Sequence, residues 1–339
     1  MNAFDFVSAR TLDEALAAGA AQGAAFLAGG TNLVDLMKAG VSRPGRVVHI
    51  GRLEGLDRIE TLPDGAVRIG ALVRNADLAG LPLIAEAALS GASAQLRNAA
   101  TVGGNLMQRT RCPYFFDAVS ACNKREPGAG CDAQGGETRH AAVLGTSAHC
   151  VATHPSDLAV ALVALDAVAE IAGPAGRREL PLESFHRLPG DTPQRETELQ
   201  PGELILAVRL PASAKSFAAH ARYVKARDRV SYAFALASAA AALRLDGGRI
   251  IEARLALGGV ATKPWRARAA EAALAGAAPG PEAFAKAAAL ALEGAQPVGD
   301  NGFKIELARR VVVRALTLAA AGTPKALPAL PASPFGVLA

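Results

Sequence analysis

All four cysteines of this 339-residue chain fall between residues 112 and 150, and this clustering constrains the fold more than any other feature. The segment is rich in Gly, Pro, Asn and charged residues and has no hydrophobic periodicity. A metal centre would therefore hold it folded where a hydrophobic core cannot. Four thiolates are the usual ligands of an iron–sulfur cubane or of a structural zinc ion. The candidate ligands are Cys112, Cys122, Cys131 and Cys150.

The spacing of these cysteines leaves the type of centre open. Nine, eight and eighteen residues separate consecutive cysteines, so the paired Cys-x2-Cys motifs of a zinc ribbon are missing. This favours an iron–sulfur cluster over zinc, with free or paired thiols as a further alternative. His140, His149 and His154 lie nearby, but histidines beside a metal loop more often surround the ligands than act as ligands.

Composition argues against several functional classes. With 51% hydrophobic residues, the chain can bury substantial cores and is expected to form two or three domains. Its net charge of +5 includes no run of like charges, so we expect no nucleic-acid partner. The N-terminus shows no signal-peptide pattern, and no apolar run approaches transmembrane length, so we expect no membrane insertion.

The first 55 residues predict a small parallel sheet of β–α–β type. A capping box at residues 11–14 opens a helix through about Ala21. Strands at 25–28 and 46–50 flank a second helix at 33–38. The short connections between these elements favour parallel strands.

The rest of the chain predicts antiparallel sheets combined with helices, and therefore an α+β fold. The middle part predicts a hairpin over 56–72, helical structure to 94, a helix from 157 to 165, a hairpin around 173–176 and a strand at 204–210. A separate domain begins near residue 215, with strands at 231–245 and 249–257 followed by helices at 266–275, 281–291 and 305–320.

Two glycine pairs are candidates for ligand binding. Residues 28–32, Ala-Gly-Gly-Thr-Asn, join a predicted strand to a predicted helix, where glycines allow close backbone approach and the helix N-terminus offers N–H groups to an anion. Residues 101–105, Thr-Val-Gly-Gly-Asn, carry a second pair. Two such turns suggest two cradles for one extended anionic ligand, such as a dinucleotide pyrophosphate. Two unrelated turns are the alternative.

Asp157 is a third candidate. It follows Ser156 at the start of a predicted helix, where such a pair is ordinarily an N-cap. The aspartate can also accept hydrogen bonds from a ribose or an adenine.

Together these motifs resemble the FAD-binding medium subunits of the molybdenum hydroxylases, the xanthine dehydrogenase and carbon monoxide dehydrogenase flavoprotein family. The resemblance covers essentially the whole chain and includes residues 257–264, Leu-Gly-Gly-Val-Ala-Thr-Lys-Pro. It implies that the two glycine turns hold the FAD pyrophosphate and that the aspartate contacts the adenosine part. The implied FAD-binding residues are Ala28, Gly29, Gly30, Thr31, Asn32, Leu33, Thr101, Gly103, Gly104, Asn105 and Asp157.

Lys225 is a further candidate, at the end of a predicted strand. A solvated charged edge is the plain interpretation of the run Lys-Ala-Arg-Asp-Arg at 225–229. The resemblance instead implies that Lys225 lies near the pyrimidine end of the flavin, where a cation stabilises the negative charge of the reduced ring.

The resemblance also implies the domain organisation. It predicts a FAD-binding domain of two subdomains, of the PCMH-like type, then a C-terminal α+β domain with an antiparallel sheet and helices. The predicted limits are 1–214 for the first domain (subdomains 1–55 and 56–214, with a cysteine-rich insertion at 106–155), 215–325 for the second and 326–339 for an extended tail.

The insertion distinguishes this chain from most of the family, which connects the second glycine turn to the Ser-Asp helix directly. It resembles the insertion of the periplasmic aldehyde oxidoreductase FAD subunits, which surrounds a [4Fe–4S] cluster. The matching stretches are Arg-Cys-Pro-Tyr at 111–114, Cys-Asn-Lys-Arg-Glu-Pro-Gly-Ala-Gly-Cys at 122–131 and His-Cys-Val-Ala-Thr-His-Pro-Ser-Asp at 149–157. The β subunit of 4-hydroxybenzoyl-CoA reductase is the nearest alternative.

By this resemblance the chain is the electron-transfer subunit of a heterotrimeric molybdenum enzyme that converts an aldehyde and water to a carboxylate. A large subunit with a molybdenum–molybdopterin cytosine dinucleotide carries the substrate site, and a small subunit carries two [2Fe–2S] clusters. Electrons pass to FAD here and then to an external acceptor, so we expect no catalytic residue in this chain. Xanthine-dehydrogenase-like and zinc-stapled, non-enzymatic subunits are alternatives. We expect periplasmic localisation by export with a signal-bearing partner, or else the cytoplasm.

Overall fold

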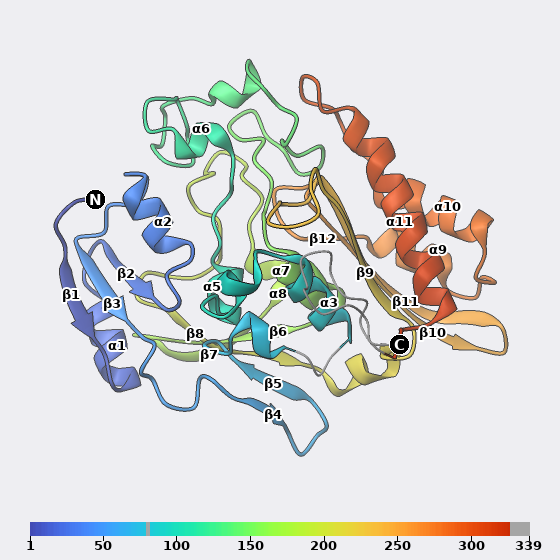
Figure 1. Ribbon diagram of the computed structural model, residues 1–339, viewed down its shortest axis with the longest axis horizontal. Coiled ribbons are helices and arrows are strands. Elements are labelled where there is room, and N and C mark those ends of the chain that lie inside the picture. Colours follow the sequence, from blue (N-terminus) through green and yellow to red (C-terminus); the bar gives the residue numbers. More distant parts are fainter. Residues whose placement is uncertain (79–81, 326–339) are drawn as a thin grey trace.

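The computed structural model describes residues 1–78 and 82–325, which form three β-sheets with helices between and outside them (Figure 1). The mixture of sheets and helices, with an antiparallel sheet in the C-terminal part, confirms the predicted α+β class. Among the described residues, no helix is long and apolar enough to cross a membrane. The predicted tail, 326–339, lies outside the described residues.

The N-terminal sheet is parallel, as predicted, and has the strand order β1-β3-β2. The sequence does not predict strand β1, because the strand has only four residues, two exposed and two half-buried, and carries little pattern. Thr11 caps the first helix, its Oγ1 accepting a hydrogen bond from Glu14 N at 3.2 Å. The elements are β1 Asp5–Ser8, α1 Leu12–Gly19, β2 Ala24–Leu27, α2 Leu33–Lys38 and β3 Arg46–His49.

The middle sheet is antiparallel, with the strand order β4-β5-β8-β6-β7. It consists of β4 Ile59–Thr61, β5 Val67–Gly70, β6 Val168–Gly173, β7 Gly176–Pro181 and β8 Leu204–Leu210. The helical segments of this part are η1 Asn75–Asp77, α3 Pro82–Ser90, α4 Ala94–Arg97, α5 Val102–Leu106, α7 Asp157–Ala164 and α8 Leu182–Phe185. All eight residues of α7 are buried, which explains its continuous apolar sequence.

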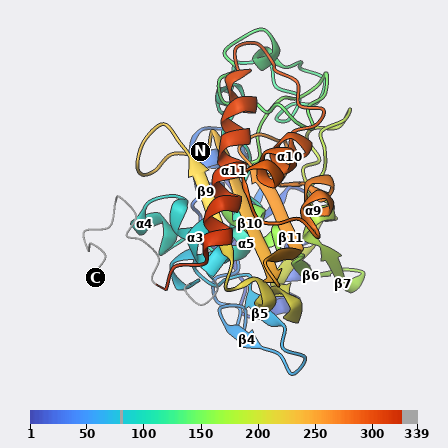
Figure 2. The ribbon, with the colours of Figure 1, turned by 90° about the vertical axis from the view of Figure 1, so that its right-hand side faces the viewer.

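The C-terminal sheet is also antiparallel, in the order β12-β11-β10-β9, and helices α9 to α11 cover its outer face (Figure 2). The predicted strand at 231–245 is wrong over its first six residues, because 227–236 form a loop in which Tyr232 has φ = +51°. The elements are β9 Ala221–Ala226, β10 Ala237–Asp246, β11 Arg249–Gly258, β12 Trp265–Arg266, α9 Arg268–Leu274, α10 Pro281–Ala291 and α11 Phe303–Ala321.

Strand β10 joins the two main cores because both of its faces are buried. Ala239 and Leu243 belong to the core under the C-terminal helices, whereas Ala240 and Ala242 belong to the core that contains α7. Alternate residues of a strand point to opposite faces, so this division follows from the backbone. The small alanine side chains allow α7 and α11 to approach the sheet from opposite sides.

The cysteine-rich insertion forms a lobe of loops between α2 and the C-terminal sheet (Figure 1). Its short elements are α6 Pro113–Phe116 and η2 Asp132–Gln134. The expectation that it has no core needs correction, because Phe115 is fully buried in a small cluster with Leu36 and Cys122. Part of that core comes from α2, so the local pattern of the insertion did not show it.

Candidate functional site

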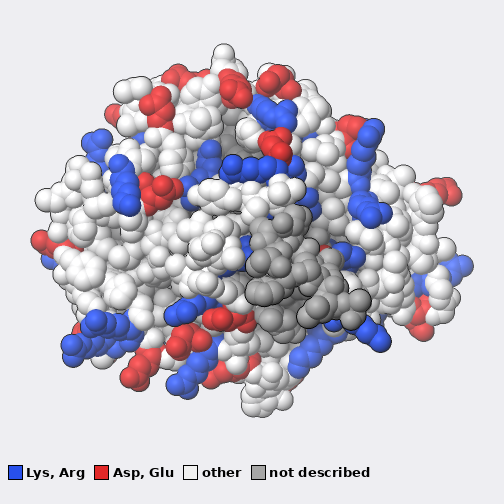
Figure 3. Space-filling model, in the orientation of Figure 1, with Lys and Arg blue, Asp and Glu red and all other residues white. Residues whose placement is uncertain are grey.

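A cavity of about 820 Å³ lies where the N-terminal sheet, the insertion, α7 and the C-terminal sheet meet. Its size falls within the range of about 300–1,000 Å³ typical of ligand and cofactor sites. Four buried polar atoms on lining residues have no hydrogen-bond partner: Asn32 Nδ2, Asn75 Oδ1, Arg111 Nε and His154 Nε2. Buried polar groups are rarely unpaired in proteins, so these atoms point to a polar ligand. Figure 3 shows basic side chains in a band across the upper middle of one face.

The first glycine turn lies on the wall of this cavity. Gly30 has φ = +74°, a backbone conformation that residues other than glycine rarely adopt. Gly29 packs against the backbone before the second turn: a Cβ atom there would lie 1.8 Å from Ala99 O. The first turn therefore packs on the backbone that leads into the second, and the positions of Gly29 and Gly30 both favour glycine.

The second glycine turn forms the first turn of α5. Thr101 is the N-cap, and its Oγ1 accepts a hydrogen bond from Gly104 N at 3.2 Å. Gly103 N donates to Ala71 O at 2.8 Å, so this residue faces the middle sheet. Gly104 faces the cavity, because a Cβ atom there would meet only Thr101 Oγ1, at 3.1 Å. The exposed backbone of Gly104 can therefore approach a ligand.

Asp157 and Lys225 form a buried ion pair on the cavity wall. Lys225 Nζ lies 2.8 Å from Asp157 Oδ2, and the side chains are 4% and 8% exposed. Tyr223 Oη donates to Asp157 Oδ1 at 2.7 Å, and burial, followed by the charge of Asp157, raises the pKa of Tyr223 well above its usual value. The resemblance implies a contact of Asp157 with the adenosine part of FAD and of Lys225 with the flavin, and these two roles stay predictions.

The predicted FAD-binding residues divide into two groups. The cavity is lined by Gly30, Thr31, Asn32, Gly104, Asn105, Asp157 and Lys225. The others support the turns or adjoin them: Ala28, Gly29, Leu33, Thr101 and Gly103. Asn105 also links the second turn to α7, since Ser156 Oγ donates to its Oδ1 at 3.4 Å.

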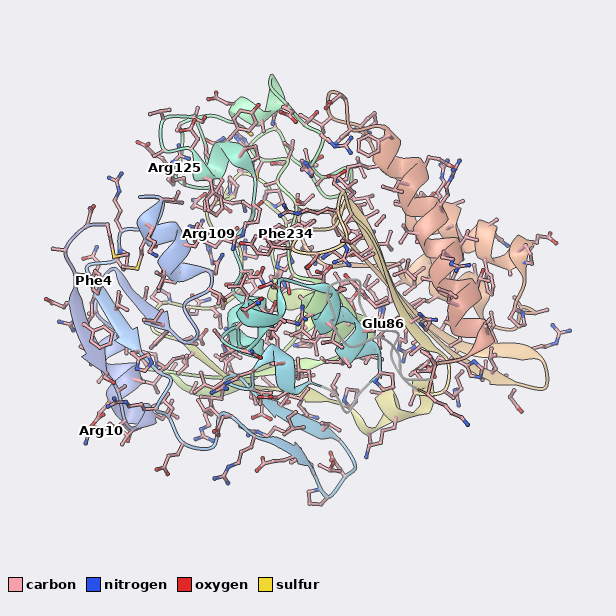
Figure 4. All side chains as sticks on the ribbon, viewed as in Figure 1. Phe4, Arg10, Glu86, Arg109, Arg125 and Phe234 are labelled. Atoms are coloured by element: carbon pink, nitrogen blue, oxygen red, sulfur yellow. The ribbon has the colours of Figure 1, made fainter. Side chains whose placement is uncertain are left out.

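Sequence reasoning missed the charged and aromatic side chains that close the cavity. Arg111 in the insertion pairs with Asp35 of α2, and its guanidinium lies 5.4 Å from the ring centre of Phe234. Figure 4 labels Phe234 between the insertion and the central helices. The sequence predicts a strand from residue 231, so it does not indicate that the 227–236 loop lines the cavity. The missed lining residues include Arg111, Arg139, Arg229, Tyr232 and Phe234.

The four cysteines line one small cavity inside the insertion. None forms a disulfide, and Cys122 and Cys131 face each other in an isolated β-bridge. Burial raises the pKa of Cys112 to about 11 and also raises the pKa of Cys131 and Cys150. The cavity itself is small, with a volume of about 10 Å³.

The arrangement of these thiols bears on the kind of metal centre. Among residues 1–78 and 82–325, no three His, Cys, Asp or Glu side chains are grouped closely enough to hold a single metal ion. A tetrahedral zinc site needs all four sulfurs about 2.3 Å from one ion.

Polar side chains of residues 123 and 125 connect the cysteine loops by hydrogen bonds. Asn123 Nδ2 donates to His149 O at 3.1 Å, and its Oδ1 accepts from Gly130 N at 2.9 Å. Arg125, labelled at the top of Figure 4, donates to the carbonyl oxygens of Tyr114 and Phe115 at 2.8 and 3.0 Å. The guanidinium also donates to the carbonyl oxygens of Ala118 and Ser120.

A third cavity of about 270 Å³ adjoins the first two and shares lining residues with both. His154 and His186 line it in an edge-to-face contact, with ring centres 4.3 Å apart and an angle of 65° between the ring planes. Burial lowers the pKa of His154 well below its usual value and that of His186 to about 4, so both rings are neutral near pH 7. Glu196 lies beside them; burial alone would raise its pKa, but Lys124 and Arg109 hold it below the usual value.

The sequence matches two known family models in succession. Residues 2–213 match the FAD binding domain in molybdopterin dehydrogenase, and residues 221–319 match the CO dehydrogenase flavoprotein C-terminal domain. The chain is 48% identical to the aldehyde oxidoreductase FAD-binding subunit PaoB of Escherichia coli, over 95% of this chain and 99% of that one. It is 28% identical to the carbon monoxide dehydrogenase medium chain of Hydrogenophaga pseudoflava, over 93% and 96%.

Solved structures show the same fold. The carbon monoxide dehydrogenase from Hydrogenophaga pseudoflava that lacks the Mo-pyranopterin moiety superposes with a TM-score of 0.72 at 28% identity, covering 94% of this chain and 98% of that one. The reconstituted CO dehydrogenase from Oligotropha carboxidovorans gives a TM-score of 0.74 at 25% identity, with the same coverage.

Proposed function

Because the chain belongs to the family of FAD-binding medium subunits of the molybdenum hydroxylases, an oxidoreductase family, we propose that it serves a heterotrimeric, molybdenum-dependent aldehyde oxidoreductase. The 48% identity to an aldehyde oxidoreductase subunit over nearly the whole of both chains supports this substrate class. The xanthine dehydrogenase relative is more distant, at 31% identity over 73% of this chain, which makes that class the second candidate.

The observation that carries the proposal is that one cavity joins both glycine turns to Asp157. When bound, FAD supplies the electron-transfer chemistry, and the protein positions and tunes it. Gly30 and Gly104 let the backbone approach the pyrophosphate, and the unpaired Nδ2 of Asn32 can donate to a ligand oxygen. Asp157 would contact the adenosine part and Lys225 the pyrimidine end of the flavin, and both side chains line this cavity.

We further propose that Cys112, Cys122, Cys131 and Cys150 hold one [4Fe–4S] cluster. Their common cavity and their lack of disulfides support the proposal. A β subunit of the 4-hydroxybenzoyl-CoA reductase type is the alternative within this group. The large molybdenum subunit, the small [2Fe–2S] subunit, the external acceptor and export to the periplasm with a signal-bearing partner remain part of this proposal.

Replacing Gly104 with valine tests the FAD site. The added side chain points into the cavity, where no other protein atom lies within 4 Å except Thr101 Oγ1, so it should exclude cofactor and leave the fold intact. Gly30→Val should also lose FAD, but with added backbone strain from its positive φ. The control is Gly45→Val, where an added Cβ meets nothing within 4 Å. Full FAD occupancy in both test variants would refute the assignment.

Metal analysis of anaerobically purified protein tests the cluster. One cubane predicts about four irons per chain with equal acid-labile sulfide. Visible absorbance should add broad iron–sulfur bands to the flavin maxima. Stoichiometric zinc without sulfide would instead support the zinc-stapled alternative.

A further inference from the structure

Among the described residues, Lys124 is the one positively charged side chain that lines the cysteine cavity. It follows Cys122 by two residues, and its side chain is only 11% exposed. Its Nζ lies 2.9 Å from Glu196 Oε1 and donates to Pro193 O at 3.1 Å. These two contacts from a different loop fix the ammonium group beside the proposed cluster.

Glu196 offsets part of this positive charge. Its other carboxylate oxygen pairs with the guanidinium of Arg109, and its side chain is 24% exposed. Arg109 also donates to Lys124 O at 3.2 Å and stacks on Phe115, with its guanidinium 4.5 Å from the ring centre. Two cations and one carboxylate therefore form a partly buried network that keeps a net positive charge near the thiolates.

We propose that Lys124 and Glu196 set the reduction potential of the cluster in opposite directions. This inference rests on the proposed cluster. Reduction adds one electron to a centre that is already anionic through its four thiolates, and no proton or bond change accompanies it. A nearby cation stabilises the reduced form more than the oxidised form, and a nearby carboxylate does the reverse. Charge and hydrogen bonding around a cluster are among the factors that set its potential.

The test is a redox titration of the full-length protein with dithionite, followed by the electron paramagnetic resonance signal of the reduced cluster. Lys124→Met should lower the potential and Glu196→Gln should raise it. We expect each to change the equilibrium constant for reduction about tenfold, which is about 59 mV for a one-electron couple. A purely structural role would not produce shifts of opposite sign.

Three controls separate charge from other effects. Lys124→Arg keeps the charge and should keep the wild-type potential. Lys286→Met, on an exposed position of α10, and Glu198→Gln, whose partner is Arg187, should leave the potential unchanged. Iron content and FAD content are measured for every variant, so that a lost cluster is not mistaken for a shifted one.

The outcomes distinguish this inference from the proposed function. Wild-type protein without about four irons would refute the cluster itself. An intact cluster whose potential is unchanged in Glu196→Gln, or shifts the same way in Glu196→Gln and Lys124→Met, would overturn the electrostatic assignment. If Lys124→Met does not retain a cluster, the electrostatic assignment is tested by Lys124→Arg and Glu196→Gln alone. A lowered potential in Lys124→Arg would also overturn that assignment.

Discussion

Gly29 lies directly against the backbone carbonyl of Ala99, so the first glycine turn packs on the residues that lead into the second. A Cβ atom at Gly29 would come within 1.8 Å of Ala99 O and 2.6 Å of its carbonyl carbon. Neither atom belongs to a flexible side chain that could move aside. The relative position of the two turns therefore depends on the absence of one side chain.

We predict that Gly29→Ala separates the two turns and strongly reduces FAD content. Overpacking of this kind typically costs about 1–3 kcal/mol, so the variant should still fold. Flavin per chain, measured by absorbance after purification, is the direct readout. Gly135→Ala is the matched control, because an added Cβ there meets nothing within 4 Å and its φ is not positive. Normal flavin content in Gly29→Ala would contradict the prediction.

The Asp157–Lys225 pair should contribute to stability as well as to binding. Lys225→Met leaves a buried carboxylate whose remaining side-chain partner is Tyr223, and breaking a buried pair in this way costs about 3–5 kcal/mol. The double variant Asp157→Asn/Lys225→Met should be less destabilised than the sum of the single variants, because no unpaired charge remains. Urea unfolding of the four proteins gives the coupling energy. Additive effects would show that the two charges do not interact.

Acid should destabilise the protein through His186. Its pKa falls from 6.5 to about 4 because burial disfavours the charged ring. Between these values the unfolded chain binds a proton that the folded chain does not, so the free energy of unfolding decreases as the pH falls from 6.5 towards 4. Near pH 5 the decrease from this group is about 2 kcal/mol.

The variant His186→Gln checks this prediction, because glutamine does not titrate and can still donate to Leu106 O, the partner of His186 Nε2 at 2.9 Å. Urea unfolding at pH 7.5 and pH 5 should show a smaller loss of stability for this variant than for the wild type. His220→Gln, which replaces another ring bonded to a carbonyl, serves as the control. Equal pH dependence of His186→Gln and the wild type would show that the ring is not buried in its neutral form.

Much of the candidate site could be predicted from the sequence because its signals are local. Each glycine turn is a run of five consecutive residues, and the cysteines stand apart by composition alone. Helix α10 was predicted at its observed limits, since Gly280 and Pro281 mark its start and alanines continue it. Such features depend on neighbouring residues, which a sequence displays directly.

The features that were not predicted depend on residues far apart in the chain. The charged groups of Asp157 and Lys225 meet across 68 positions, and no local pattern marks them as partners. Residues 231–236 look like strand because they continue the apolar run of β10, yet the backbone turns away at Tyr232. That loop instead brings Phe234 to Arg111 of the insertion, a contact that only the folded chain defines.

The last prediction concerns what holds the insertion folded. Arg125 donates to four carbonyl oxygens between residues 114 and 120, and hydrogen bonds from a charged group contribute about 1.5–3 kcal/mol each. Arg125→Lys keeps the charge but cannot reach this many acceptors at once, so limited proteolysis between Arg109 and His149 should accelerate at least about tenfold. Cys131→Ser should accelerate cleavage through loss of the cluster, whereas Arg43→Lys, which loses one exposed contact to Gly40 O, should not. A comparison of iron-free proteins separates the loss of Arg125 hydrogen bonds from the loss of the cluster. Iron-free Arg125→Lys should still be cleaved faster than iron-free wild type. Equal cleavage of the iron-free proteins would mean that the cluster alone orders these loops.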